Sequence, residues 1–235
     1  MQGAIDYGSR RINYTAKFSE RGTLAISVLP DCSVEMTAPF GTEQGELERR
    51  LRRRAGWVCR QLDRFERFSP RTPPRRYVGG ETHLYLGKQY RLKIVVTEEA
   101  EHVRLVGGYF IVGLPDRYDT ARVKTLLDRW YRDKAEWRLR ECFEKALPTF
   151  ERLGCSRPRL RIQHMPRRWG SRSANGTITL NPDLIRAPTM CIDYVVAHEL
   201  CHLVEPNHGA AFFRLLGKLM SDWEKRKERL ERLLI

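Results

Sequence analysis

The segment from Ile192 to His208, IDYVVAHELCHLVEPNH, carries the strongest pattern in this chain. His198 and His202 are four residues apart, so on a helix both imidazoles lie on one face and reach one metal ion. Glu199 stands beside them, where its carboxylate points toward a bound water. The aliphatic residues around the motif indicate a buried helix, which gives a metal site rigid support. This spacing predicts a zinc site.

A third ligand is expected shortly after the motif, because a catalytic zinc usually takes three protein ligands and leaves a fourth position open. His208 is the preferred candidate, since Pro206 disfavours helical geometry in the residue before it and lets the chain turn back to the metal. Glu205 is the alternative. Zinc lowers the pKa of its water to about 7, and Glu199 then takes the proton and delivers it to a leaving amine. The predicted reaction is metal-assisted hydrolysis.

Length and composition limit the class of protein. The chain has 235 residues, 41% of them hydrophobic and 10% aromatic, which predicts a globular protein rather than a disordered one. Its 43 basic and 29 acidic residues give a net charge of +14, which attracts polyanions such as nucleic acid. Neither a signal peptide nor a membrane span is evident, and the six cysteines form no Cys-x-x-Cys pair. A cytoplasmic protein with reduced thiols and no membrane partner is expected.

Alternating hydrophobicity predicts β-structure in the first half of the chain. A hairpin is expected from Leu24 to Met36 around a Pro30-Asp31 turn, and helical spacing follows from Leu47 to Phe65. Residues 69–82 hold three prolines and two glycines, which indicates a loop or a subdomain boundary. Two more strand regions, each crossing a turn with glycine, are expected at 84–96 and 103–112. Mostly antiparallel sheet is therefore predicted here, without an internal repeat.

The second half is predicted to be mainly helical. Asp119 or Thr120 is expected to cap a long helix with Trp137 on its apolar face, and Pro148 is expected to end it. Short strands are predicted near Leu160 and at 177–180, the latter after an Asn-Gly turn, and the tail from Gly209 is helical again.

Two segments resemble one known family. The active-helix segment described above and RWGSRSANGTITLN, from Arg168 to Asn181, are similar to the YgjP-like zinc metallopeptidases, relatives of the SprT-like and WLM proteases. A hairpin at 23–39 and a basic C-terminal helix at 223–234 fit the same family. The resemblance implies zinc as cofactor, the ligands His198, His202 and His208, and Glu199 as general base. It also implies protein or peptide substrates.

The resemblance carries further expectations for substrate binding. The strand from Thr177 to Asn181 is expected to lie beside the active helix and to offer its edge to an extended peptide. Trp169 is a candidate wall of the cleft, although tryptophan before a glycine turn is more often hydrophobic core. The chain departs from the family at Arg172, where a small residue or cysteine is usual, and at Pro182, where an aromatic is usual. No residue stands out as an oxyanion donor.

Together these patterns predict the α+β class. An N-terminal antiparallel β-rich part with a long helix is expected over residues 1–118, and a zincin-like helical metallopeptidase part with a small sheet over 119–235. The two parts are expected to form one continuous domain over about residues 14–235. The histidines outside the motif are expected to be structural or at the surface: His83, His102 and His164.

Basic residues gather directly before the active helix. Residues 151–173 contain one glutamate and seven arginines: Arg152, Arg157, Arg159, Arg161, Arg167, Arg168 and Arg172. They form either a solvated face or a docking surface for nucleic acid. Besides the zinc peptidase, two alternatives stay open. One is a metal-dependent phosphohydrolase acting on nucleotides, since the same activated water attacks phosphorus, and the other is a zinc-stabilised, nucleic-acid-associated binding protein.

Overall fold

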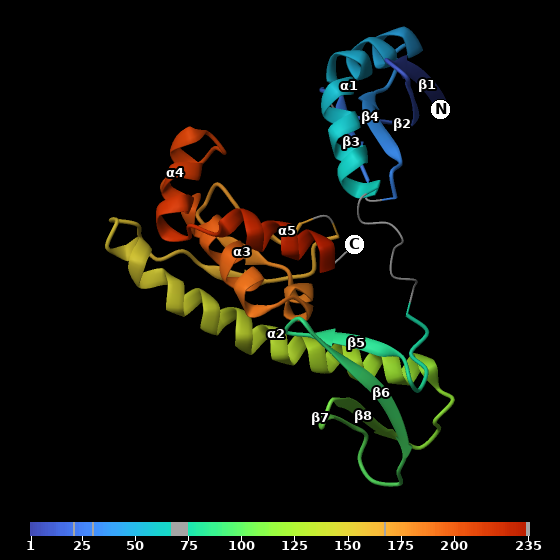
Figure 1. Ribbon diagram of the computed structural model, residues 1–235, viewed down its shortest axis with the longest axis vertical. Helices are drawn as coiled ribbons and strands as arrows, with labels where there is room; N and C mark the ends of the chain where they lie inside the picture. The colour runs from blue at the N-terminus through green and yellow to red at the C-terminus, as the bar shows by residue number, and fades with distance from the viewer. Residues whose placement is uncertain (21, 30, 67–74, 167, 234–235) are drawn as a thin grey trace. The chain divides into compact units, whose positions relative to one another are not determined.

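The computed structural model describes residues 1–20, 22–29, 31–66, 75–166 and 168–233 (Figure 1). It divides into two compact units, Met1–Pro73 and Pro74–Leu234, each with a hydrophobic core of its own. This division falls within the predicted loop at 69–82, of which residues 69–74 lie outside the described residues, as do Pro30 of the predicted turn and Arg167.

The first unit is a four-stranded sheet packed against one helix. Its strands are β1 (Gln2–Tyr7), β2 (Arg10–Ser19), β3 (Ala25–Val28) and β4 (Val34–Pro39), in the order β1-β2-β4-β3. The helix α1 (Gln44–Glu66) buries residues spaced three or four apart: Leu47, Leu51, Ala55, Val58 and Leu62. The predicted hairpin and helix are confirmed, because both follow from local periodicity.

The second unit begins with another four-stranded sheet. Its strands are β5 (Thr82–Tyr85), β6 (Lys88–Val96), β7 (His102–Val106) and β8 (Tyr109–Leu114), in the order β5-β6-β8-β7. In both units two antiparallel hairpins join through a parallel central pair, β2 with β4 and β6 with β8, and a long helix follows. The β-rich α+β class and the mostly antiparallel pairing are confirmed, whereas the repeat of this strand order in the two units was not predicted.

The helix after the second sheet is α2 (Thr120–Glu151). Its cap is the predicted one, because the Asp119 carboxylate accepts from the Arg122 N–H at 2.8 Å. Pro148 does not end the helix, which continues to Glu151. A proline removes one backbone hydrogen bond, and the helix continues for only about one turn beyond it. Trp137 is 61% exposed, since it lies two residues beyond the buried Ala135 and off the apolar face.

The remaining elements surround one buried helix. A sheet of β9 (Leu160–Ile162), β10 (Gly170–Arg172) and β11 (Ile178–Leu180) is followed by a 3-10 turn, η1 (Pro182–Arg186). Then come α3 (Thr189–Cys201), α4 (Ala210–Leu219) and α5 (Trp223–Leu233). Helix α3 packs against α2, α4, α5 and β10. None of the six cysteines forms a disulfide in the described part of the chain, and no described helix is long and apolar enough to cross a membrane.

Candidate active site

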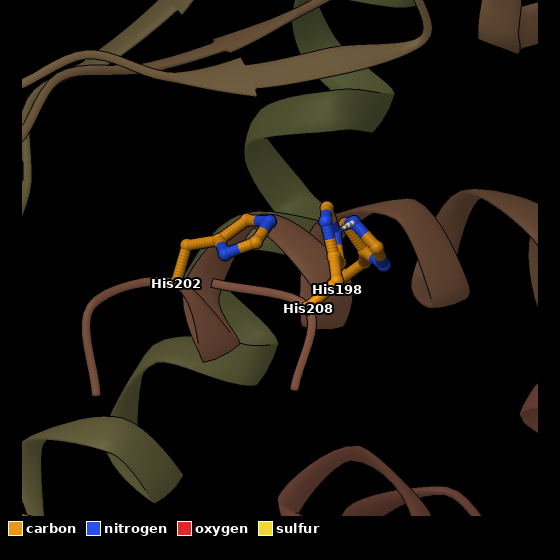
Figure 2. Close-up of side chains that lie close together, drawn as sticks. All are labelled: His198, His202 and His208. Carbon is orange, nitrogen blue, oxygen red and sulfur yellow. Dashed lines mark hydrogen bonds between the residues drawn. The ribbon is translucent and has the colours of Figure 1, made fainter. Parts of the chain in front are cut away.

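Three histidines converge at the end of α3 (Figure 2). His198 lies in the last turn of α3, His202 caps the helix, and His208 returns from the loop before α4. One nitrogen of each ring lies within 4.8 Å of the others, and His208 Nε2 is 2.9 Å from His198 Nε2. Helix α3 ends at Cys201, earlier than Pro206 predicts, and this gives the following loop room to bring His208 back.

Two neighbours hold these rings. His202 Nδ1 lies 3.1 Å from the main-chain carbonyl oxygen of Glu205. With its proton on Nδ1 the ring donates to this carbonyl and leaves Nε2 for a metal. Glu205 therefore contributes its main chain, and its carboxylate is outside the histidine group. The buried Phe212 packs on all three rings, with centroids 5.0 Å from His198, 4.6 Å from His202 and 4.8 Å from His208.

This donor set fits a divalent metal such as zinc. Nitrogens bound at 2.0–2.1 Å to a tetrahedral ion are roughly 3.4 Å apart, which the three histidines accommodate with small ring movements. Burial, together with the charges of His202 and His208, lowers the pKa of His198 to about 3. Burial and His202 also lower the pKa of His208. These two rings are therefore neutral near pH 7 and present lone pairs.

Glu199 lies beside the histidines with only 6% of its surface exposed. Burial raises its pKa to about 7, and the nearby Arg168 opposes this rise. The carboxylate packs directly against β10, because a Cβ added to Gly170 would lie 2.6 Å from both its Cγ and its Oε1. Gly170 was missed as a site residue. The signal for it was a glycine inside a strand, which often marks a close approach by another group.

The predicted strand lies beside α3, since both β10 and β11 contact this helix, but it is not at the edge of its sheet. In the order β10-β11-β9, β11 pairs with neighbours on both sides, so residues 177–181 offer no free edge to a peptide. Strand order depends on long-range pairing, which alternation along the sequence does not encode. The edge strand that packs against α3 is β10.

The two residues predicted on the β11 edge, Thr177 and Asn181, form hydrogen bonds with the adjoining loops. The Thr177 N–H donates to Ser173 Oγ at 3.1 Å, and its carbonyl accepts from the Ser173 N–H at 2.9 Å, which closes the turn. Asn181 is 3% exposed, and its amide donates to the carbonyls of Met165 and Arg168 at 2.8 and 3.0 Å. Asn181 thus holds the loop that leads into β10.

The other predicted residues lie around this site or away from it. Trp169 is half-buried against the core and directly precedes β10. Phe213, which was not predicted as a site residue, stacks between His208 and Trp223, with centroids 6.2 and 5.2 Å away. Three histidines lie apart from the group, each beside another partner: His83 near Glu81, His102 near the Ala100 carbonyl, and His164 near Asp183.

A helix that presents two histidines and a glutamate, completed by a third histidine from the next loop, defines the site of a metallopeptidase. The model of the YgjP-like metallopeptidase domain matches residues 22–233, and the chain belongs to this family. It is therefore a peptidase, a hydrolase that acts on proteins or peptides, and the resemblance noted in its sequence is confirmed.

Two solved structures are similar to part of the chain. The metallopeptidase zymogen abylysin of Pyrococcus abyssi is 25% identical, with 41% of this chain and 94% of that chain covered and a TM-score of 0.37. The metallopeptidase zymogen jannalysin of Methanocaldococcus jannaschii is 19% identical, with 41% and 97% covered and a TM-score of 0.37. A search of curated proteins gave no match.

Proposed function

We propose that this protein is a zinc endopeptidase in which His198, His202 and His208 hold the metal and Glu199 is the general base. The observation that carries the proposal is the buried Glu199 carboxylate beside three converging imidazoles. Three ligands leave a fourth position for water or substrate, as in catalytic rather than structural zinc sites. The lack of disulfides among the six cysteines in the described part of the chain favours a cytoplasmic location.

Different residues have separate roles in the proposed reaction. A bound zinc ion lowers the pKa of water to about 7 and polarises the carbonyl under attack. Glu199, whose pKa burial raises to about 7, accepts the proton of the attacking water near neutral pH and returns it to the leaving amine. Gly170 lets this carboxylate lie against β10. His198 and His208, whose pKa values are lowered by burial, stay neutral, and Phe212 packs on all three imidazoles.

Substrate binding is proposed at β10 rather than at β11. An edge strand presents unpaired main-chain groups, and an extended peptide that pairs with them is bound with little dependence on its sequence. Residues Gly170–Arg172 run beside the helix that carries Glu199, so such a peptide passes the base. Trp169, directly before this strand, is the proposed wall of the cleft.

The test compares wild type with Glu199→Gln, which keeps the size of the side chain and removes its basicity. Zinc content is measured by mass spectrometry, and cleavage is followed on an unfolded fluorescent protein. Equal zinc content and a loss of about 100-fold or more in kcat/KM are expected. A Glu199→Gln enzyme that cleaves at the wild-type rate would show that Glu199 is not the base.

Two further arms address the other hypotheses. Nucleoside triphosphates replace the protein substrate in one arm, and metal-dependent release of phosphate would favour the phosphohydrolase. Labelled DNA is added in the other, because five of the arginines between residues 151 and 173 are exposed: Arg152, Arg157, Arg159, Arg161 and Arg168. Binding that weakens with salt would support docking on nucleic acid, and no binding at low salt would exclude it.

A further inference from the structure

A hollow lies next to the proposed active site, and its described lining residues include neither Glu199 nor any of the three histidines. It has a volume of about 460 Å³ and lies between the loop after α2, the β10–β11 hairpin and the end of α3. Three arginines line it, Arg157, Arg159 and Arg172, together with the apolar side chains of Leu203 and Val204. We refer to this hollow as the arginine cavity.

Its position follows from two elements of the site. Leu203 comes directly after His202, so the cavity begins where the metal-binding turn ends. Arg172 is two residues beyond Gly170 on β10, and side chains two apart on a strand point to the same face. Since the Cβ direction of Gly170 points at Glu199, Arg172 also extends from β10 on the side of α3.

The arginine cavity carries positive charge that none of its described lining residues neutralises. No acidic residue is among its described lining residues. Arg157 forms an ion pair with Glu144 outside the cavity, whereas Arg159 and Arg172 form none with any residue that the structure describes. The Nε of Arg172 is buried and has no hydrogen-bond partner in the described part of the chain.

A buried donor without a partner is costly, so its site favours a ligand that supplies an acceptor. A guanidinium group pairs best with a planar, bidentate anion, and a carboxylate matches this fork. The apolar lining from Leu203 and Val204 suits the methylene groups that carry such a carboxylate. A hollow of this size beside an edge strand suits one side chain of an extended peptide better than a nucleic-acid backbone, which needs a continuous groove.

We propose that the arginine cavity binds a carboxylate of the peptide substrate, with Arg172 as the principal contact and Arg159 as the second. This inference rests on the proposed function, because it places the peptide along β10. A strand advances about 3.3 Å per residue, so the carboxylate belongs to a residue about two positions from the one beside Gly170. It therefore lies close to the cleaved bond. An Asp or Glu side chain and a free C-terminus both supply this group.

The experiment separates these two sources. Internally quenched peptides with amidated C-termini are made in Glu and Gln versions, with the changed residue placed in turn at each of three positions on either side of the cleaved bond. One Gln peptide is also made with a free C-terminus close to that bond. The wild-type enzyme is expected to prefer a carboxylate at one position by about tenfold or more in kcat/KM.

The variants are Arg172→Gln, Arg159→Gln, their combination, and Arg172→Lys, with Arg161→Gln as control. Arg161 is an exposed arginine of β9 outside the cavity. We expect Arg172→Gln to remove most of the preference, Arg172→Lys to keep part of it, and Arg161→Gln to keep all of it. Zinc content and circular dichroism show whether each variant is folded.

Binding is measured separately from cleavage. The Glu199→Gln protein is titrated with fluorescent Glu and Gln peptides, alone and combined with Arg172→Gln, and anisotropy is recorded. Carboxylate-dependent binding that needs Arg172, without cleavage by wild type, would support the arginine-cavity proposal and refute the proposed endopeptidase function. If the Glu and Gln peptides of every pair are cleaved and bound equally, the cavity proposal alone would be overturned. The same holds if the preference for Glu survives in the variant that combines Arg172→Gln with Arg159→Gln. Loss of DNA binding in the double variant, without any carboxylate preference, would also overturn it and assign the cavity to nucleic acid.

Discussion

Replacing Gly170 by alanine should remove most peptidase activity and leave the metal in place. The three atoms nearest to the new Cβ all belong to Glu199: Cγ and Oε1 at 2.6 Å and Cδ at 2.8 Å. Carbon atoms in ordinary contact are about 3.5–4.0 Å apart, so either the carboxylate or β10 has to move by about 1 Å. The base would then no longer lie where it meets the attacking water.

The magnitude follows from this displacement. A misplacement of about 1 Å costs on the order of 100-fold in rate, which corresponds to about 2.7 kcal/mol in the barrier. Overpacking of a well-packed site also costs about 1–3 kcal/mol of stability. None of the three atoms nearest to the new methyl group belongs to a histidine, so the affinity for zinc should change little.

The assay measures kcat/KM on a quenched peptide, zinc content and thermal unfolding for wild type, Gly170→Ala and Ser171→Ala. Ser171 is the matched control, because it is the next residue of β10, and its hydroxyl faces the Met165 sulfur at 3.7 Å rather than Glu199. Ser171→Ala should retain wild-type kinetics. A folded Gly170→Ala enzyme with kcat/KM within about threefold of wild type would refute the inference that β10 positions Glu199.

Three further predictions concern the metal, pH and the units. His208→Ala should lose stoichiometric zinc after dialysis, whereas Glu205→Ala should keep it, because Glu205 acts through its carbonyl; the reverse result would make the Glu205 carboxylate the ligand. In metal-free protein, burial raises the pKa of Glu199 from 4.5 to about 7. The fold therefore favours the protonated carboxyl, and wild type loses stability as the pH rises from about 4.5 to about 7. Glu199→Gln should be more stable than wild type by about 3 kcal/mol at pH 8 and nearly equal at pH 4 in urea unfolding with a chelator, and a pH-independent difference would contradict this. The fragment 75–233 should unfold cooperatively and bind zinc, because its core shares no residue with that of the first unit; an unfolded fragment would favour the single continuous domain expected over 14–235.

The metal group is the part of the site that the sequence could predict. Two histidines four apart on a helix share a face whatever the rest of the fold does, so His198 and His202 needed only local geometry. His208 followed from a helix break, although the break comes before Pro206. Gly170 and Arg172 could not be placed in the same way. Their contacts depend on which strand of a three-stranded sheet lies at its edge, and that is set by long-range pairing.

The same distinction separates the correct and incorrect expectations about the sheets. Hairpins were predictable because their turns are local, as at Gly87, Gly107 and Gly108, which all have positive φ. The parallel pairing of β2 with β4 and of β6 with β8 joins strands of different hairpins, and no turn signals it. The repeat is one of strand order rather than of sequence, and its local sign is a proline at the end of the last strand of each sheet: Pro39 ends β4 and Pro115 follows β8.

This repeat shows what the second unit adds to carry a metal site. Helix α1 has 23 residues and packs on its own sheet, whereas α2 has 32. The first half of α2 faces the sheet through Trp130 and Tyr131, whose rings lie 4.9 and 5.6 Å from Phe110. Its second half extends under α3, where the Arg138 guanidinium donates to Thr189 Oγ1 at 3.2 Å (Figure 1). The additional length of α2 thus supports the helix that presents His198 and Glu199, so a substitution in its second half should disturb the metal site more than one in its first half.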